Sequence, residues 1–532
     1  MASHTIPRWR RALAILRPSH RHSPFSATVL LMASVTASRL IGLVRVKYIA
    51  WLLGRSAAAD AFNAAFQLPD MVSYFLVGGA ASITFITILS RYRDQGREHE
   101  GERAMSAILT LMALVLGGAI LLAEFAAPLY VRWWFSGFPA EKAALCTHLT
   151  RILLPAQLCF FAGGVFGAVL LVRRIFSVQA VAPLIYNTGI ILGGVLGGVL
   201  LARHASVSSL AIGAVAGAFC GPFLLNAIGA HRVGMRFRPV LDLSNPGLRE
   251  WVRMSVPLML GVSLVTADNW IINYFASHVG GAITLLTYAK TVFTAPVALG
   301  QAAGAASLPF LASLFGQSDR APFAGTVNSA VSRILAFSLL LSSFMIAMAL
   351  PLVDVLVRGG AFHRADSATM ALYFGIFSFS LCLWSAQALY ARAFYAAGNT
   401  VTPMVAGTLV TAASIPVYWI LYRSVGPAGL AVASDIGIFL QTSVLAVLLH
   451  RRRMVSLGGL EYAELARALM AALVAFAALY GIRSLMHTTS RLHELVWLAG
   501  TAVVWFAISM LTLQLSGSSL PSQLMERLGR KA

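Results

Sequence analysis

Charged side chains are scarce in this chain, and acidic ones are the scarcest. Only 11% of the 532 residues are charged, with 19 Asp and Glu against 40 Lys and Arg, whereas a soluble globular domain has roughly 25% charged residues. Hydrophobic residues make up 58%, and many apolar runs exceed the roughly 18 residues that indicate a membrane-spanning helix. This composition excludes a soluble globular protein and predicts an all-α protein that crosses a membrane many times.

Cysteine is rare as well, and the common motifs of catalysis are missing. The four cysteines lie in apolar runs without CxxC spacing, so they predict neither a disulfide framework nor a metal site. The chain has no P-loop, no HExxH motif and no Ser/His/Asp arrangement on a soluble scaffold. We therefore expect neither an enzyme nor a cofactor, while the membrane potential and an ion gradient both stay open as energy sources.

Hydropathy and the positions of Gly, Pro and charge predict about fourteen transmembrane helices. The predicted spans, in chain order, are 27–53, 59–90, 104–130, 144–171, 177–201, 208–230, 250–276, 282–315, 328–355, 368–396, 401–422, 427–450, 463–485 and 494–515. The Lys and Arg residues at the ends of these spans favour one side by roughly three to one, which places both chain termini in the cytoplasm. The net charge of +21 is thereby explained by topology and by contact with membrane lipids, and it does not indicate binding to nucleic acid.

The two halves of the chain resemble each other. The stretch GGAASITF (Gly78 to Phe85) recurs as AGAASLPF (Ala303 to Phe310), 225 positions later, and Pro69 is mirrored by Pro296. Each copy contains six spans, an even number, so the copies share one orientation in the membrane. Prolines within spans break helices where freed backbone groups can face a cavity. We expect two facing six-helix bundles that rock in alternating access, with two extra C-terminal helices.

Spans and charges together divide the chain into six parts. The two bundles are joined by a basic cytoplasmic segment, and basic tails stand at both ends. The predicted parts are a basic N-terminal tail at 1–26, a six-helix bundle at 27–230, a basic linker at 231–249, a second bundle at 250–452, the extra helices at 453–517 and a basic C-terminal tail at 518–532.

Three cations lie within the first span, at Arg39, Arg45 and Lys47. A charge near the bilayer centre costs between about 2.5 and 17 kcal/mol, depending on how it is estimated. Arg39 is nearest the centre, so we expect it to line a hydrated cavity or to pair with Asp60 or Asp70 of the second span. Arg39 and Lys47 are about 80° apart around a helix and can share one broad face, although Lys47 can also extend to the outer interface.

The seventh and eighth spans carry the corresponding polar groups of the second repeat. These are Asp268, Asn269 and Asn273 in the seventh span and Lys290 in the eighth. Hydrogen bonding between helices and a role in cation coupling or substrate binding both explain them. The candidates for conformational or cation-coupling roles are therefore Asp60, Asp70, Asp268, Asn269 and Asn273.

Four stretches resemble a known family. They are SRLIGLVR (Ser38 to Arg45), ADAFNAAFQLPD (Ala59 to Asp70), GVSLVTADNWIINYFAS (Gly261 to Ser277) and ARAFYAAGNTVTP (Ala391 to Pro403). Together they resemble the MurJ/MviN family of bacterial lipid II flippases, in the multidrug/oligosaccharidyl-lipid/polysaccharide exporter superfamily, over essentially the whole chain after about residue 27. The resemblance implies a multi-pass protein of the bacterial inner membrane. It also implies a central cavity whose arginines bind the pyrophosphate and sugar of lipid II, here Arg39 and Arg45, and a conformationally important acid at Asp60.

The chain departs from this family pattern at several charged positions. Val46 replaces an acid, Ser73 and Tyr74 stand where the family tends to have two arginines, and Gly78 replaces a glutamate. The family's Asp-Arg in the eighth span reads Lys290-Thr291 here.

The resemblance, together with the cations within the spans, implies a flippase for the lipid-linked peptidoglycan precursor, which serves cell wall biogenesis. A diphosphate head needs cations, and the substrate-binding candidates are Arg39, Arg45, Lys47 and Lys290. Three alternatives stay open: export of another polyprenyl-linked oligosaccharide, cation-coupled drug antiport, and a transport-dead cell-wall scaffold. We expect a monomer whose partners are a lipid-linked anionic glycan, membrane lipids and proteins of cell-wall synthesis.

Overall fold

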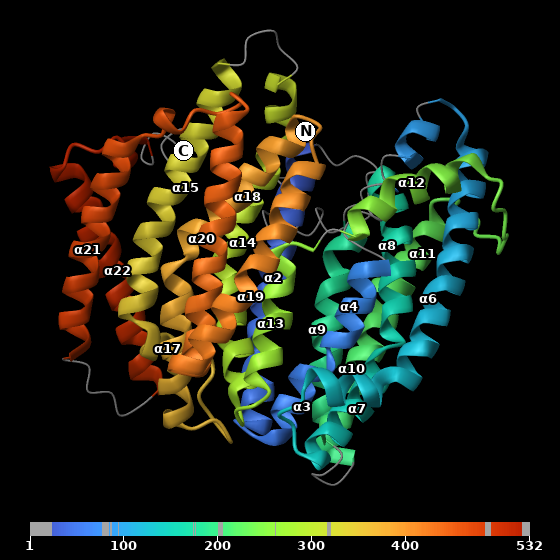
Figure 1. The fold of residues 1–532 in the computed structure, drawn as a ribbon, viewed down its shortest axis with the longest axis horizontal. Coiled ribbons are helices and arrows are strands. Elements are labelled where there is room, and N and C mark those ends of the chain that lie inside the picture. The colour runs from blue at the N-terminus through green and yellow to red at the C-terminus, as the bar shows by residue number, and fades with distance from the viewer. Residues whose placement is uncertain are drawn as a thin grey trace, which may run out of the picture. The chain divides into compact units, whose positions relative to one another are not determined.

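The structure is a computed structural model, drawn in Figure 1. It describes residues 24–76, 85, 88–93, 95–173, 175, 177–200, 206–260, 262–315, 321–484 and 491–523. Residues 1–23 of the predicted N-terminal tail (1–26), residues 524–532 of the predicted C-terminal tail (518–532) and residues 78–84 of the repeat motif lie outside these ranges. Within the described ranges the chain is helical apart from turns and one isolated bridge between Gly359 and Phe362, which confirms the all-α fold class.

The described chain divides into two compact units, which we treat separately. The first unit comprises Met1–Ile49 and Ser56–Leu260, and the second comprises Ala50–Arg55 and Gly261–Ala532. The helices of the first unit are α2 (Pro24–Leu53, whose last residues belong to the second unit), α3 (Ala57–Ala65), α4 (Gln67–Leu76), α6 (Glu98–Trp134), α7 (Ala140–Leu153), α8 (Ala156–Val172), α9 (Ser177–Leu200), α10 (Ser206–Ala218), the π-helix η2 (Phe219–Leu225), α11 (Asn226–Arg232) and α12 (Pro246–Leu260).

The second unit contains the remaining helices, with two of them added after the predicted repeat. They are α13 (Leu264–Ala276), α14 (Ala282–Phe315), α15 (Ala321–Ala347), α16 (Ala349–Leu356), α17 (Arg364–Phe379), α18 (Leu381–Ala396), α19 (Val401–Val425), α20 (Pro427–Arg451), the 3-10 turn η3 (Leu457–Gly459), α21 (Tyr462–Ser484) and α22 (Arg491–Leu515).

Nine helical spans among the described residues are long and apolar enough to cross a membrane. A tenth arises if α17 and α18, which are bent by 43° at Ser380, form one span. The polytopic helical architecture is thereby confirmed, and the number fourteen stays a prediction.

Several predicted spans are interrupted. The second span breaks at Phe66, between α3 and α4, because Pro69 has no N–H to give to the carbonyl of Ala65. The eighth span differs, since α14 continues through Pro296. The predicted seventh span, 250–276, is divided between α12 and α13, and α12 packs against α4 and α6 in the first unit.

Helices α9 and α10 approach each other through glycines. A Cβ atom on Gly193 would lie 2.6 Å from the Cα of Gly213, and one on Gly213 would lie 2.4 Å from the carbonyl oxygen of Gly189. Small residues of this kind let two helix backbones pack closely in a membrane, where van der Waals contact drives association.

Replacing Gly193 by leucine is expected to destabilise the first unit by about 2 kcal/mol or more, because the side chain would meet backbone atoms that cannot rotate away. Gly198 on the same helix has no atom within 4 Å of its Cβ position, so Gly198→Leu is the matched control. Thermal denaturation in detergent, followed by size-exclusion chromatography, should show a lower melting temperature for Gly193→Leu only. Equal melting temperatures for the two variants would contradict close helix contact.

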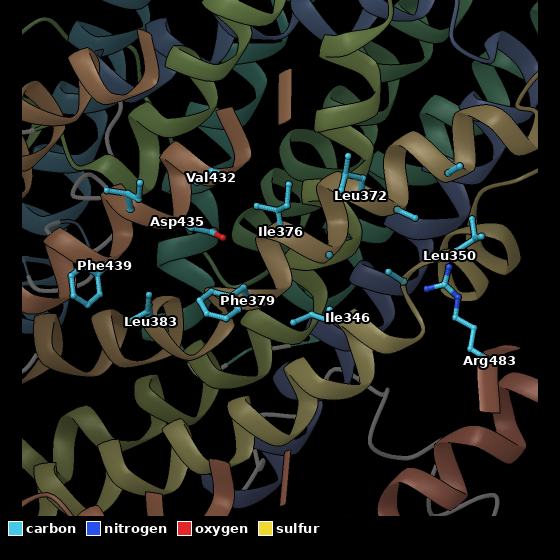
Figure 2. A pocket seen from close by; sticks show the side chains of 15 residues that line it. Ile346, Leu350, Leu372, Ile376, Phe379, Leu383, Val432, Asp435, Phe439 and Arg483 are labelled. Atoms are coloured by element: carbon cyan, nitrogen blue, oxygen red, sulfur yellow. The ribbon is translucent and has the colours of Figure 1, made fainter. Parts of the chain in front are cut away.

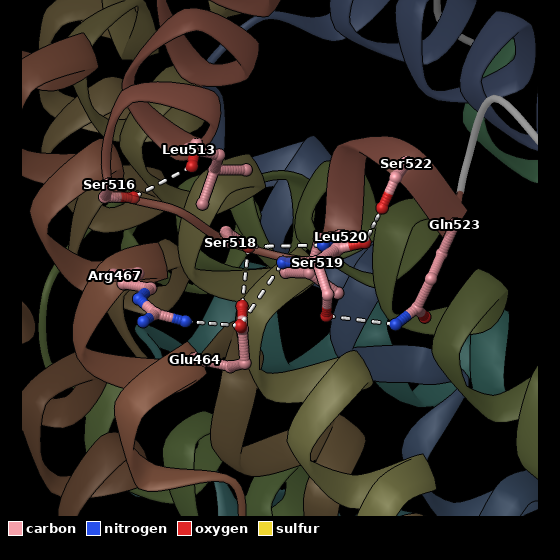
Figure 3. Close-up of polar contacts among 9 residues, drawn as sticks. All are labelled: Glu464, Arg467, Leu513, Ser516, Ser518, Ser519, Leu520, Ser522 and Gln523. Carbon is pink, nitrogen blue, oxygen red and sulfur yellow. Dashed lines mark hydrogen bonds and ion pairs between the residues drawn. The ribbon is translucent and has the colours of Figure 1, made fainter.

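The C-terminal helices pack onto α15 and onto each other (Figure 1). Trp505 of α22 donates from Nε1 to the carbonyl oxygen of Leu340 on α15 at 3.1 Å. At one end, Glu464 of α21 accepts hydrogen bonds from Arg467 at 2.7 Å and from the Ser518 hydroxyl at 2.5 Å, beyond the end of α22 (Figure 3).

At its other end, α22 is bound through Arg358, which follows α16. The guanidinium of Arg358 pairs with Glu494 at 2.6 Å and with Asp354 at 3.3 Å. Helix α22 is therefore attached to the second unit near both of its ends.

Candidate functional site

A buried ion pair joins α3 and α7 in the first unit. Helix α3 begins at an N-cap, Ser56, whose hydroxyl accepts from the backbone N–H of Ala59 at 3.2 Å. Asp60 follows in the first turn and is completely buried. The ammonium of Lys142 donates to Asp60 Oδ2 at 2.6 Å and lies 4.0 Å from the ring centroid of Phe138.

Lys142 is a functional candidate that the sequence reading missed. The predicted fourth span began at 144, which left this lysine outside the membrane, whereas α7 begins at Ala140 and buries it to 7% exposure. The signal was Pro139, because a proline just before an apolar run commonly marks a helix start. Burial of both charges means that removing either partner leaves the other uncompensated in a low-dielectric environment.

The cations of the first span occupy different environments in the first unit. Arg39 is exposed, whereas Arg45 and Lys47 are half-buried. Asp60, one of the two expected partners of Arg39, makes its ion pair with Lys142.

The other acid of the second span, Asp70, lines a cavity of the first unit with a volume of about 380 Å³. Tyr186 of α9 lines the same cavity, and Arg45 lies close enough to Tyr186 to interact with it electrostatically. The tertiary structure thus brings Arg45 of the first span within electrostatic range of Tyr186, a residue that lines this cavity.

A second buried cluster joins four helices of the second unit. Asp268 of α13 is completely buried and pairs with Lys290 of α14. It also accepts hydrogen bonds from the hydroxyl of Tyr418 on α19 and from that of Ser434 on α20, the latter at 2.8 Å. The ammonium of Lys290 lies 5.7 Å from the ring centroid of Trp384, a distance at which a cation is attracted to the ring face.

Asp268, one of the three polar residues predicted in the seventh span, belongs to this cluster. Asp268 receives the donors from α14, α19 and α20, whereas Asn269 is exposed and Asn273 is half-buried. Tyr418 and Ser434 were missed because a hydroxyl in an apolar helix carries no local sign of its partner.

An apolar cavity of about 820 Å³ is formed by α15, α16, α17, α18, α20 and α21 in the second unit. Figure 2 shows Asp435 and Arg483 on separate parts of a lining that is otherwise hydrocarbon. Asp435 accepts from the hydroxyl of Ser380 at 2.5 Å. Such walls suit an alkyl or prenyl chain better than a diphosphate, whose charge needs several donors.

Comparisons with known proteins match the chain to one family. The family model described as lipid II flippase MurJ matches residues 49–500. The chain is 25% identical over 438 residues to the probable lipid II flippase MurJ of Vibrio cholerae serotype O1, covering 79% of this chain and 82% of that protein. It is 26% identical over 444 residues to the lipid II flippase MurJ of Burkholderia cenocepacia, covering 80% and 84%.

Solved structures show the same fold. A structure of lipid II flippase MurJ in an inward closed conformation has a TM-score of 0.75 at 20% identity, covering 91% of this chain and 99% of the other. An inward-facing multidrug resistance MATE family transporter of the MOP superfamily has a TM-score of 0.63 at 14% identity, covering 79% and 98%. Because the family model spans most of the sequence, and the helical fold agrees with it, the chain belongs to the MurJ family of lipid II flippases.

Proposed function

We propose that this chain translocates lipid II, the lipid-linked peptidoglycan precursor, across the bacterial inner membrane by alternating access. The family match over residues 49–500 is the observation that carries the proposal. The protein would act as a multi-pass monomer with both termini in the cytoplasm, supplying a precursor for cell wall biogenesis. Its partners would be the anionic lipid-linked glycan, the surrounding lipids and proteins of cell-wall synthesis.

The cations of the first span are proposed to bind the head of the substrate. Arg39 is exposed and Arg45 is half-buried, so a ligand can reach both side chains. A guanidinium matches a phosphate with two parallel hydrogen bonds, which adds geometric specificity to the charge attraction. Lys47 would supply a further cation, whereas Lys290 is neutralised by Asp268 and would reach the substrate only in a state in which that pair opens.

The two buried ion pairs are proposed to hold each unit in one arrangement of its helices. Asp60–Lys142 fixes α3 to α7, and Asp268–Lys290 fixes α13 to α14. An alternating-access cycle needs states that differ in such contacts, since a ligand shifts an equilibrium only through its different affinity for the two states. Asp70, Asn269 and Asn273 remain candidates for coupling to an ion or to the membrane potential.

The two units are proposed to correspond to the two predicted six-helix bundles. Under this proposal the segment at 231–249 is the cytoplasmic linker, and α21 and α22 form the two-helix appendage after 452. The basic residues of the linker, Arg232, Arg236, Arg238 and Arg249, would then lie beside anionic headgroups of the inner leaflet.

The test is to deplete the host's own lipid II flippase, express this chain and measure lipid II exposed at the outer face of the membrane. Rescue is expected from the wild type and should fall by roughly tenfold or more in Arg39→Ala, because a charged hydrogen bond to the head is lost. Arg132→Ala, which removes another exposed cation of the same unit, is the matched control and should rescue fully.

The proposal fails if correctly inserted wild-type protein does not restore lipid II export. Resistance to cationic drugs without lipid II export would favour the antiporter instead. Full rescue by Arg39→Ala would be consistent with lipid II transport but would show that Arg39 is not needed to bind the substrate.

A further inference from the structure

The cavity of about 380 Å³ in the first unit, which we call the Asp70 cavity, lies at the break in the second span. Phe66, the residue between α3 and α4, lines it together with Asp70 and Ser73 of α4. Helix α4 packs against α7 and α8, and α10 packs against α7, α8 and α9. Ion sites in membrane proteins often form where a spanning helix is interrupted, because irregular backbone is tolerated there only beside a cavity or within protein.

Asp70 brings a negative charge into this cavity without a counter-ion from the chain. It is exposed to the hollow, and its carboxylate makes neither an ion pair nor a hydrogen bond with any residue that the structure describes. Asp60, by contrast, is paired with Lys142. The other described residues of the lining are uncharged. Because a lone carboxylate within a membrane span is costly, the cavity favours a positively charged ligand.

Neutral oxygen atoms surround the same cavity. Gln157 of α8 is only 6% exposed and lines the cavity, and its amide has no hydrogen-bond partner within the described ranges. Ser73 and Tyr186 each add a hydroxyl to the lining, and Asp70 lies close enough to Tyr186 to interact with it electrostatically. A buried amide without a partner is costly, so Gln157 also favours a ligand in this cavity.

These groups suit a hard cation with a single charge. Carboxylate, amide and hydroxyl oxygens are the ligands that hard cations prefer, and the described lining contains neither cysteine nor histidine. One carboxylate balances one positive charge. Arg45, which lies within electrostatic range of Tyr186, adds positive charge nearby and so disfavours a divalent ion. The volume leaves room for water molecules that complete the coordination shell.

We propose that the Asp70 cavity binds a monovalent alkali cation, Na⁺, through the carboxylate of Asp70 and the amide oxygen of Gln157. Because these residues belong to α4 and α8, the bound cation would stabilise one arrangement of the first-unit helices. As a device that couples transport to an ion gradient, the site rests on the proposed function. As a binding site it can be measured without transport.

Equilibrium binding of radioactive Na⁺ to the full chain in detergent tests the proposal, with choline chloride added to keep the ionic strength constant. Wild type is expected to bind Na⁺ saturably. Asp70→Asn should weaken the affinity by about tenfold or more, because the charged ligand is lost, and Gln157→Leu by about threefold or more, because one neutral oxygen is lost. Glu141→Gln, which removes an exposed acid of the same unit, is the matched control and should bind like wild type.

Thermal unfolding gives a second readout. Replacing choline chloride by NaCl at equal ionic strength should raise the melting temperature of wild type and of Glu141→Gln, because a ligand that binds only the folded state stabilises it. Asp70→Asn keeps the size of the side chain, and its melting temperature should be the same in both salts.

Equal Na⁺ affinity in wild type and Asp70→Asn would overturn the proposal, as would the absence of saturable binding to wild type. Displacement of Na⁺ by Mg²⁺ at equal concentration would contradict the assignment to a monovalent ion. The lipid II export assay gives a separate result. Wild type that binds Na⁺ but does not rescue export would contradict the transport function and not the cation site, whereas rescue without Na⁺ binding would contradict the cation site alone.

Discussion

Lys142→Met is expected to lower the free energy of unfolding by about 3–5 kcal/mol, because it leaves the Asp60 carboxylate buried without its counter-ion. Asp60 is completely buried and Lys142 is 7% exposed, so water cannot replace the missing ammonium. Methionine has a similar length and keeps the packing against Phe138, which isolates the loss of charge. Thermal and denaturant unfolding of the purified protein in detergent would measure the effect.

The double variant Asp60→Asn/Lys142→Met should recover most of this stability, since replacing both partners of a buried pair by uncharged groups is often close to neutral. Arg132→Met, at an exposed cation of the same unit, is the matched control and should change stability by about 0.5 kcal/mol at most. A single Lys142→Met variant as stable as wild type would show that the pair does not hold α3 against α7.

Asp268→Ala should be at least as damaging, because one carboxylate serves three donors from three other helices. Without this carboxylate, the buried ammonium of Lys290 loses its counter-ion, and the buried hydroxyls of Tyr418 and Ser434 lose their hydrogen-bond acceptor. We expect a destabilisation of about 3–5 kcal/mol from the charge alone, against about 1.5–3 kcal/mol for Tyr418→Phe, which removes one hydrogen bond to a charged group. Unfolding of both variants in detergent compares the loss of the whole carboxylate with the loss of one donor.

The neighbouring residue provides the matched control. Asn269 is exposed on the same helix, and Asn269→Ala should change stability by about 0.5 kcal/mol at most. A double-mutant cycle between Asp268→Asn and Lys290→Met should yield a coupling energy of about 0.5–3 kcal/mol. Additive effects in that cycle, or equal losses for Asn269→Ala and Asp268→Ala, would refute the central place of Asp268.

Much of the fold was predictable because its determinants are local. Hydropathy over about 18 residues identifies membrane helices whatever their neighbours are, and the stretches SRLIGLVR and ADAFNAAFQLPD pointed to the family that the comparisons show. Helix breaks were less predictable: Pro69 interrupts the second span and Pro296 leaves α14 continuous. Both prolines lack the N–H that would bond to the carbonyl four residues earlier. Packing around each proline determines whether the helix is interrupted there or continues.

The site shows the same division between local and long-range information. The sequence by itself determined that Asp60 and Asp268 lie in apolar surroundings and need partners, because burial of a lone charge is costly wherever it occurs. Only the tertiary structure decided which partners they have. Lys142 is 82 positions from Asp60, and Tyr418 and Ser434 are 150 and 166 positions from Asp268. Such pairs form because helix packing brings side chains from distant spans together, and no local pattern records that packing.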